Sequence, residues 1–225
     1  MSDEALRPAD LRVNYDLGRL EEADLPPTPL AAFGLWFAAA VAAAVTEPNA
    51  MVLATADGDG APSTRTVLLK GVDPRGFAFY TNLTSRKGRE LAANPRASLT
   101  FPWYSLHRQV TVIGRAELVP RGEVAEYFAS RPRGSRLGAW ASRQSSVIPG
   151  REPLESAYHA MAQEYPEGSD IPVPDFWGGW LIRPTTVEFW QGRESRLHDR
   201  LRFRALHADA AVDDAAAWQL ERLSP

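Results

Sequence analysis

The stretch that decides the fold runs from residue 50 to residue 81 and reads AMVLATADGDGAPSTRTVLLKGVDPRGFAFYT. Three parts of it alternate between apolar and polar residues, as strands with one buried face do: residues 50–56, 63–70 and 76–81. Between them, residues 57–60 (Asp-Gly-Asp-Gly) tolerate positive φ, and residues 73–76 (Asp-Pro-Arg-Gly) place Asp, Pro and Gly where a type I turn prefers them. This stretch therefore predicts antiparallel hairpins.

An Ala-rich apolar segment, residues 30–45, precedes the hairpins and lies between Pro29 and Glu47. Its bulky residues recur at steps of three and four, which is typical of an amphipathic helix. The segment is shorter than the roughly 20 residues that a membrane-spanning helix needs. It therefore predicts a helix of a soluble protein whose apolar stripe must pack against another part of the structure.

The rest of the chain predicts further strands and inserted helices. The strands are expected at residues 96–101, 109–118, 177–183, 185–191, 201–206 and 217–223, and the helices at residues 85–94, 122–130, 135–143 and 152–164. We expect the acidic connection that contains Asp209, Asp213 and Asp214 to be a solvated hairpin loop. The fold class is then α+β, predominantly antiparallel β, with a closed or nearly closed barrel and inserted and flanking helices.

Composition excludes several classes of function. The 225 residues fit one domain, and 25 Lys and Arg against 28 Asp and Glu give a net charge of -3, so no overall basic field attracts nucleic acid or a membrane. The absence of Cys excludes disulfides, thiolate nucleophiles and Cys-type zinc sites. The four His lack metal-ligand spacing, so no metal is expected. The first 28 residues lack the apolar core of a signal peptide, which favours a cytoplasmic location.

Basic residues gather in four clusters despite the acidic balance: Arg65 with Lys70; Arg86 with Lys87; Arg131 with Arg133 and Arg136; and Arg196 with His198 and Arg200. Each cluster alone is equally well explained as a solvated decoration of a sheet edge. Ser85-Arg86-Lys87, however, opens an expected helix, where free backbone donors and the helix dipole favour a phosphate.

A second phosphate-sized site is expected around Tyr127 and Arg131, which lie four residues apart on one helix face, with Ser135 just beyond. The alternative is a core Tyr beside an Arg in a surface ion pair. Seven Trp residues are many for this length; most belong in a core or an interface, but a planar ligand could stack on some. Two anion sites with few nucleophiles or proton-transfer groups indicate that a bound cofactor performs the chemistry.

An ordered set of short motifs resembles the pyridoxamine 5'-phosphate oxidase family from about residue 12 to the C-terminus. The motifs are Arg65-Thr66-Val67-Leu68-Leu69-Lys70, Phe79-Tyr80-Thr81-Asn82, Ser85-Arg86-Lys87, Phe101-Pro102-Trp103, Arg108-Gln109-Val110, Ser130-Arg131-Pro132-Arg133, Gly138-Ala139-Trp140, Gln144-Ser145-Ser146, Phe176-Trp177-Gly178-Gly179, Glu188-Phe189-Trp190-Gln191-Gly192, Arg196-Leu197-His198-Asp199-Arg200 and Arg222-Leu223-Ser224-Pro225. Each string alone is weak, but the ordered set is specific.

The resemblance implies an FMN-binding split β-barrel and a homodimer with active sites at the subunit interface. It implies oxidation of pyridoxamine 5'-phosphate and pyridoxine 5'-phosphate to pyridoxal 5'-phosphate, with O2 reduced to H2O2. Residues 1–27 would be an N-terminal segment, flexible or lid-like, and residues 28–225 a single FMN-binding domain.

The resemblance also assigns site residues. FMN contacts would be Arg65, Thr66, Val67, Leu68, Leu69, Lys70, Tyr80, Thr81, Arg86, Lys87, Gln109, Gln144, Ser145, Trp190 and Arg200. Substrate contacts would be Arg12, Tyr15, Lys70, Tyr127, Arg131, Ser135, Arg196 and His198, with Arg196 and His198 as the catalytic pair that orients the substrate and stabilises charge.

Three positions depart from the family pattern. Tyr104 and His107 stand where a His nearer Trp103 is expected, and Gly134 stands where an acidic residue is common. The lid segment, residues 12–15, matches more loosely than the other motifs.

Two alternatives remain open at the sequence level. One is a related split-barrel flavoenzyme on another substrate, such as a phenazine-type oxidase, which need not keep the substrate phosphate contacts; the presence of Tyr127, Arg131, Ser135, Arg196 and His198 argues against it. The other is a non-catalytic protein of the same fold that binds flavin, haem or pyridoxal phosphate.

Overall fold

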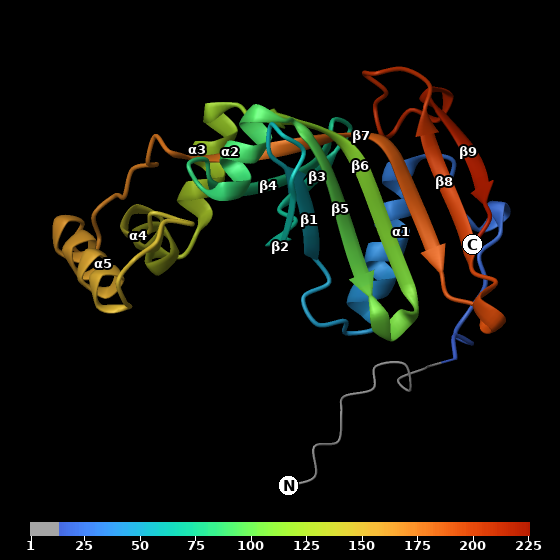
Figure 1. Ribbon diagram of the computed structural model, residues 1–225, viewed down its shortest axis with the longest axis horizontal. Coiled ribbons are helices and arrows are strands. Elements are labelled where there is room, and N and C mark those ends of the chain that lie inside the picture. The colour runs from blue at the N-terminus through green and yellow to red at the C-terminus, as the bar shows by residue number, and fades with distance from the viewer. Residues whose placement is uncertain (1–13) are drawn as a thin grey trace, which may run out of the picture.

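The protein forms one curled antiparallel sheet with α-helices at one end and on one face (Figure 1). The computed structural model describes residues 14–225. The nine strands are β1 (Ala50–Ala56), β2 (Pro62–Leu68), β3 (Gly71–Asp73), β4 (Gly76–Asn82), β5 (Arg96–Trp103), β6 (Arg108–Leu118), β7 (Trp177–Gln191), β8 (Asp199–Ala205) and β9 (Trp218–Leu223). They pair in the order β2-β1-β5-β6-β7-β4-β3, and β8 adds to β7 and β9 to β8. The predicted α+β fold with antiparallel strands is confirmed.

Strand β7 belongs to both halves of the sheet. Its first part pairs with β4, from Trp177 to Ile182, and its last part pairs with β8, from Thr186 to Gln191. The sequence predicted two strands here, interrupted at Pro184, and this prediction is wrong. The strand continues through Pro184 because the register with β6 shifts between Ile113 and Gly114, so that the missing N–H of Pro184 lies at an irregular point of the ladder.

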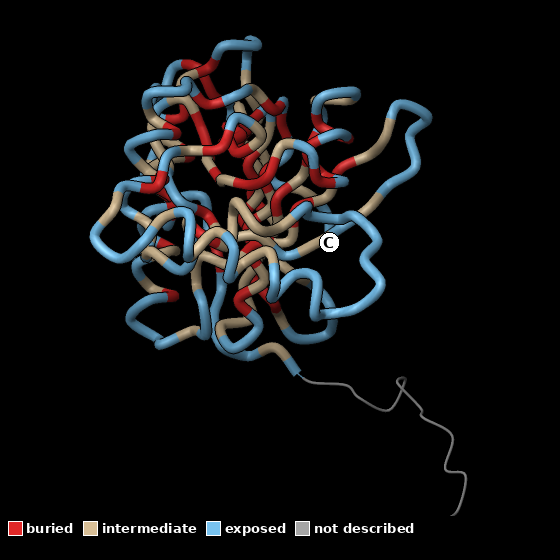
Figure 2. The backbone as a smooth tube through the Cα atoms, turned by 90° about the vertical axis from the view of Figure 1, so that its left-hand side faces the viewer, coloured by how far each residue is buried: buried red, intermediate tan, exposed pale blue. Residues whose placement is uncertain are grey.

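Helix α1 (Pro29–Ala42) confirms the helix predicted for residues 30–45, although it ends three residues earlier, and it covers one face of the sheet. The Thr28 hydroxyl caps its first turn by accepting a hydrogen bond from the Ala31 N–H. Phe33 packs 5.0 Å, centroid to centroid, from both Phe77 and Phe101, and Trp36 packs 5.1 Å from Phe189. Figure 2 shows most of the buried segments in the interior of the molecule, with the exposed segments around them.

The remaining helices lie at the end of the sheet that carries β4. They are α2 (Arg86–Ala93), α3 (Arg121–Ser130), α4 (Arg133–Ala141) and α5 (Glu152–Glu164). All four were predicted, with bounds that differ by at most two residues. A second apolar cluster forms under them, and its buried members include Val124 and Phe128 of α3 and Leu137 of α4. In Figure 1, α4 and α5 project away from the sheet.

Two local features differ from expectation. The short strand β3 was missed, because three residues are too few to show a period. The acidic connection near Asp213 is not simply solvated: Val212 is fully buried, its N–H donates to Pro74 O, and its carbonyl accepts from the Leu30 N–H. The connection therefore ties the start of α1 to the β3–β4 turn.

Candidate active site

One open cavity of about 900 Å³ brings together most of the predicted site residues. Strands β2 and β4, the start of α2, the ends of α3 and α4, and the segment after α4 form its wall. The predicted residues on that wall are Arg65, Thr66, Val67, Leu68, Lys70, Tyr80, Thr81, Arg86, Lys87, Tyr127, Arg131, Ser135, Gln144 and Ser145. Leu69, also predicted, belongs to the buried core instead and does not line the cavity.

Lys87 is the buried cation of the wall. Its side chain reaches back to Ser85, the N-cap of α2, and its Nζ donates to Ser85 Oγ at 3.3 Å and to Gln144 Oε1 at 3.0 Å. Burial, and then the charge of Arg65, lower the pKa of Lys87 to about 8. Among residues 14–225 no carboxylate forms an ion pair with Lys87, so an anionic ligand would supply the missing counter-charge.

The segment after α4, which contains Gln144 and Ser145, is held on this wall by hydrogen bonds to residues that lie far away in the sequence. Thr81 Oγ1 donates to Gln144 Oε1 at 3.1 Å, and Ser145 Oγ accepts from the Arg86 N–H at 3.1 Å. Ser145 has a positive φ of 71°, which a non-Gly residue rarely adopts. The predicted contacts of this segment therefore reach the same cavity as those of β4 and α2.

Three parallel aromatic rings form another part of the wall. Tyr80 stacks on Tyr127 with centroids 4.0 Å apart and on Trp177 with centroids 5.7 Å apart. The Arg131 guanidinium lies over Trp177, and burial lowers its pKa. Its Nη1 is buried and, in the described part of the chain, has no hydrogen-bond partner. An orphaned buried donor at a cavity fits an anion such as a phosphate.

The remaining predicted residues form a second group on the loop between β7 and β8 and the strands beside it. The ring of Tyr15 lies 5.6 Å from His198 and 5.8 Å from Trp190, and Arg196 Cζ lies 5.6 Å from the centroid of Tyr15. Only a glycine fits at residue 192, since a Cβ there would lie 2.8 Å from Tyr15 Cγ. Arg12 lies outside the described residues.

His198 and Arg196 are held differently. His198 Nδ1 accepts a hydrogen bond from the Arg193 N–H at 3.0 Å, and partial burial, followed by the charge of Arg196, lowers the pKa of His198. Arg196 is exposed and has a positive φ of 63°, next to Ser195 with a φ of 55°. A second cavity, of about 570 Å³, lies between this loop and the segment that begins with Tyr15.

Gln109 and Arg200 complete the second group. They flank Trp190 in register on the three neighbouring strands β6, β7 and β8. Gln109 Nε2 donates to Thr111 Oγ1 at 3.2 Å, and Arg200 forms a two-pronged ion pair with Glu188 at 2.8 and 3.0 Å. None of the second group lines the large cavity. In Figure 1 the loop between β7 and β8 lies at the opposite end of the sheet from α2 and α3, so a single chain keeps the two groups apart.

Several residues of the wall were missed by the sequence analysis. They are Ser63, Thr64, Asn82, Pro132, Gly138, Ala139, Ser142 and Trp177. Glu90, which lies behind the wall and binds both Arg65 and Arg86, was missed as well. Its spacing of four residues from Arg86 on one helix is the one signal that could have found it.

Residues 14–225 contain no cluster of three or more acidic, His or Cys side chains suited to a metal ion. No helix among these residues is both long enough and apolar enough to cross a membrane.

Comparisons with known proteins agree over the whole chain. The model of the family described as pyridoxamine 5'-phosphate oxidase matches residues 37–164, and that described as the pyridoxine 5'-phosphate oxidase C-terminal dimerisation region matches residues 177–225. A protein of Salinispora arenicola named pyridoxine/pyridoxamine 5'-phosphate oxidase is 55% identical, with 100% of this chain and 99% of that protein covered. A protein of Cupriavidus necator with the same name is 54% identical, with 96% and 98% covered.

Solved structures agree on the fold. PhzG from Burkholderia lata, solved with tetrahydrophenazine-1-carboxylic acid, superposes with a TM-score of 0.83 at 31% identity and covers 95% of this chain and 100% of its own. A pyridoxamine 5'-phosphate oxidase-related, FMN binding protein from Nostoc punctiforme superposes with a TM-score of 0.66 at 18% identity, over 87% and 98% of the two chains. With family models covering both halves of the sheet and relatives above 50% identity over nearly the full length, the chain belongs to the pyridoxamine 5'-phosphate oxidase family.

Proposed function

We propose that the protein is an FMN-dependent oxidase that converts pyridoxamine 5'-phosphate and pyridoxine 5'-phosphate to pyridoxal 5'-phosphate, while O2 is reduced to H2O2. One observation carries the proposal: a single cavity contains two separate cationic groups, buried Lys87 from α2 and half-buried Arg131 from the end of α3 with its buried Nη1, and neither pairs with a carboxylate of residues 14–225. A flavin phosphate and a substrate phosphate are two anions that would satisfy both.

The wall of the cavity fits FMN. Its volume of about 900 Å³ is at the upper end of ordinary ligand sites, so a flavin and a small second ring can share it. Arg86 and Lys87 stand at the start of α2, where the helix dipole adds to their attraction for the flavin phosphate. When bound, FMN supplies the hydride acceptor and the route for electrons to O2 that the side chains lack.

The substrate phosphate is assigned to Lys70, Tyr127, Arg131 and Ser135. All four line the cavity, and Tyr127 and Arg131 belong to the aromatic stack with Trp177. A phosphate bound there would orient the pyridine ring against the flavin, which lowers the entropic cost of reaching the reactive geometry. The proposed role of these residues is therefore to hold and orient, with no proton transfer required of them.

The second group of site residues is assigned to the other subunit of a homodimer. Tyr15, Gln109, Trp190, Arg196, His198 and Arg200 lie away from the cavity of their own chain, in or beside the region matched by the dimerisation model. In a two-fold dimer each subunit can contribute this group to its partner's cavity, and each contact occurs twice. Arg196 and His198 would then approach the pyridine end of the substrate, with residues 1–27 as the adjoining segment.

A related activity on a substrate without phosphate is the competing proposal, because the PhzG structure holds a carboxylic acid. The set of donors that Lys70, Tyr127, Arg131 and Ser135 present to the cavity favours a phosphate-bearing substrate, because a phosphate monoester has three terminal acceptor oxygens and a carboxylate has two.

The test is anaerobic addition of pyridoxamine 5'-phosphate to the purified yellow protein. We expect the visible flavin band to bleach and to return in air with release of H2O2. A band that stays unchanged with both phosphorylated vitamers, but bleaches with an unphosphorylated ring acid, would transfer the activity to the competing class. Protein that cannot take up FMN would refute both.

A further inference from the structure

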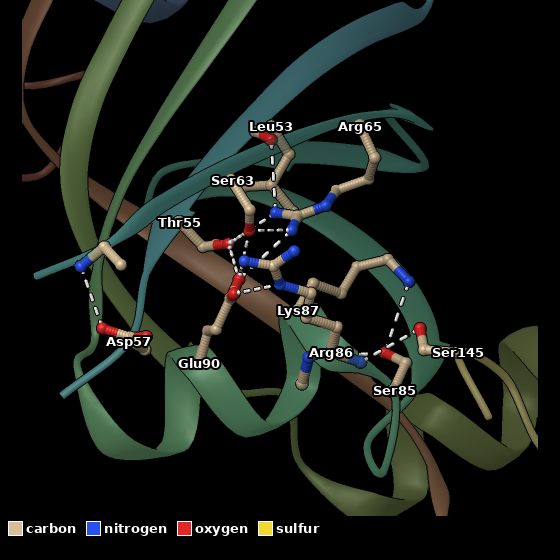
Figure 3. A network of polar contacts seen from close by, with 12 residues as sticks. Leu53, Thr55, Asp57, Ser63, Arg65, Ser85, Arg86, Lys87, Glu90 and Ser145 are labelled. Carbon is tan, nitrogen blue, oxygen red and sulfur yellow. Dashed lines mark hydrogen bonds and ion pairs between the residues drawn. The ribbon is translucent and has the colours of Figure 1, made fainter. Parts of the chain in front are cut away.

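A buried carboxylate, Glu90 of α2, lies behind the basic wall of the cavity (Figure 3). The residue is 5% exposed and does not itself line the cavity. Its Oε2 accepts hydrogen bonds from Thr55 Oγ1 at 2.5 Å and Ser63 Oγ at 2.6 Å. The same oxygen binds Arg65 Nη2 at 3.1 Å, and Oε1 binds Arg86 Nε at 2.7 Å. One carboxylate thus connects two strands to the helix that begins the basic wall.

This network fixes the guanidinium of Arg65. Nη1 donates to Leu53 O at 3.4 Å and to Thr55 Oγ1 at 2.5 Å, and Nη2 donates to Ser63 Oγ at 2.5 Å as well as to Glu90. Both terminal nitrogens are therefore engaged by the protein, while the side chain still lines the cavity. A long, flexible side chain is held in one position before any ligand arrives.

Hydrogen bonds keep the carboxyl group of Glu90 in its ionised form. Burial alone would raise its pKa, but hydrogen bonds from Ser63, Thr55, Arg86 and Arg65 lower the pKa to about 2. Glu90 is therefore ionised at neutral pH. Removing it would leave Arg65 and Arg86 without their counter-ion, would free Arg86 Nε, and would weaken the hydrogen-bond network that orients Arg65.

A role of Glu90 through its charge and a role through orienting the two arginines predict opposite changes in the affinity for an anionic ligand. A carboxylate near a phosphate repels it, so a purely electrostatic role predicts tighter phosphate binding when Glu90 is removed. Positioning predicts weaker binding, because two arginines would then have to be ordered at the moment of binding. Since Arg65 and Arg86 line the cavity and Glu90 does not, the two guanidinium groups shield the ligand from the carboxylate.

We propose that Glu90 is a positioning residue for the phosphate of the flavin: from behind the cavity wall it holds Arg65 and Arg86 in the places where they receive that phosphate. This inference rests on the proposed function, because it takes FMN as the ligand. According to this inference, Glu90 increases the preference of the site for a phosphorylated flavin over an unphosphorylated one, although Glu90 contacts neither ligand.

The test compares the dissociation constants of FMN and riboflavin, which differ only in the phosphate. For Glu90→Ala in the purified full-length protein, we expect the Kd of FMN to rise roughly tenfold, as expected for two side chains that lose their order. The Kd of riboflavin should stay within about twofold, because ring contacts are unchanged, whereas general damage to the fold would raise both values together.

Thr55→Val separates orientation from charge. It removes the hydroxyl that donates to Glu90 and accepts from Arg65, but it leaves every charge in place. We expect the Kd of FMN to rise about threefold and that of riboflavin to stay unchanged. If Glu90→Ala does not fold, this variant decides the question by the same criterion.

Glu155→Ala is the matched control. Glu155 pairs with Arg151 at the same spacing of four residues, at 2.5 Å, on the exposed surface of α5 and away from the cavity. Both dissociation constants should be unchanged. Equal or tighter FMN binding by Glu90→Ala, or an equal rise for both flavins, would overturn the inference. A wild-type protein that does not prefer FMN to riboflavin would instead refute the proposed function.

Discussion

Arg131 lies over the indole ring of Trp177, with its Cζ 4.8 Å from the ring centroid, while Nη1 of the same guanidinium is buried without a hydrogen-bond partner in residues 14–225. The ring therefore holds the cation in place without using its N–H donors. A guanidinium arranged in this way is ready for a ligand that brings its own acceptor oxygens.

Arg131→Ala should weaken substrate binding and leave flavin binding almost intact. A charge-assisted hydrogen bond is worth about 1.5 to 3 kcal/mol, so KM for pyridoxamine 5'-phosphate should rise about tenfold or more. Steady-state kinetics together with the flavin content of the purified variant measure both effects. Loss of flavin with an unchanged KM would show that the basic residues are divided wrongly between the two phosphates. Arg151→Ala, at the exposed N-cap of α5, is the control.

FMN affinity should fall as the pH rises above about 8. The pKa of Lys87 is lowered to about 8 by burial and by the charge of Arg65, so the free site loses this cation in mildly alkaline solution. A bound phosphate stabilises the charged form and raises the pKa, so binding takes up a proton above that pH. Titration of the apoprotein with FMN between pH 7 and 9.5 measures the effect, and riboflavin is the control ligand. Lys87→Met should bind FMN more weakly and without this pH dependence; the same dependence in that variant would contradict the assignment.

The same lysine affects stability in the opposite direction. Its pKa is lower in the folded apoprotein than the ordinary value of 10.5, so the unfolded chain binds more protons between about pH 8 and 10.5. The contribution of Lys87 to the free energy of unfolding of the apoprotein should therefore increase over that window. Urea unfolding of wild type and Lys87→Met at pH 7.5 and 10 isolates the contribution.

Gly88→Ala should destabilise the protein strongly. A Cβ at residue 88 would lie 2.1 Å from Leu83 O, a backbone atom that cannot move aside cheaply, so we expect a loss of about 1 to 3 kcal/mol and displacement of Lys87. Gly122→Ala is the matched control on α3, where nothing lies within 4 Å, and it should stabilise by about 0.5 to 1 kcal/mol. Thermal unfolding of the two variants should give shifts of opposite sign; a Gly88→Ala protein as stable as wild type would show that α2 can move away from Leu83.

Two variants that are each impaired at low substrate concentration should restore activity to each other. If the cavity comes from one subunit and the loop with Arg196 from the other, a mixed dimer of Arg131→Ala and Arg196→Ala contains one intact site and one doubly altered site. Random exchange should then recover about a quarter of the wild-type activity at low substrate concentration. No gain after demonstrated subunit exchange would mean that each chain builds its site alone.

Much of the fold was predictable because its signals are local. Two local patterns indicate which face is buried: the alternation in residues 50–56 and the spacing of Phe33 and Trp36. The residues around Gly58 mark the turn between two strands. Strand β7 was predicted as two because Pro184 normally ends a strand, and the compensating register shift, opposite Ile113 and Gly114 of β6, exists only in the paired sheet. A Cβ at Gly114 would lie 2.0 Å from Arg183 O, a restriction that only the paired structure reveals.

The sequence predicted which residues belong to the site better than it predicted how those residues are arranged in space. The motifs identified the basic and hydroxyl residues, and the spacing of Tyr127 and Arg131 placed them on one surface. Trp177 belongs to one of the motifs, but no local pattern shows that β7 begins beside α3, which is what places this residue on the cavity wall. The separation of Arg196 and His198 from the cavity depends on the path of the whole chain between β4 and β8, which no local pattern encodes.

Strand β7 begins with Trp177 on the wall of the cavity and ends beside Trp190, which packs against His198. Extended chain rises about 3.3 Å per residue, so the strand separates these two tryptophans by up to roughly 40 Å. Side-chain motion covers only a small part of such a span. The strand thus acts as a molecular ruler: its length dictates how far two copies must overlap, and an insertion or deletion within it should misalign both active sites at once while leaving each chain able to fold.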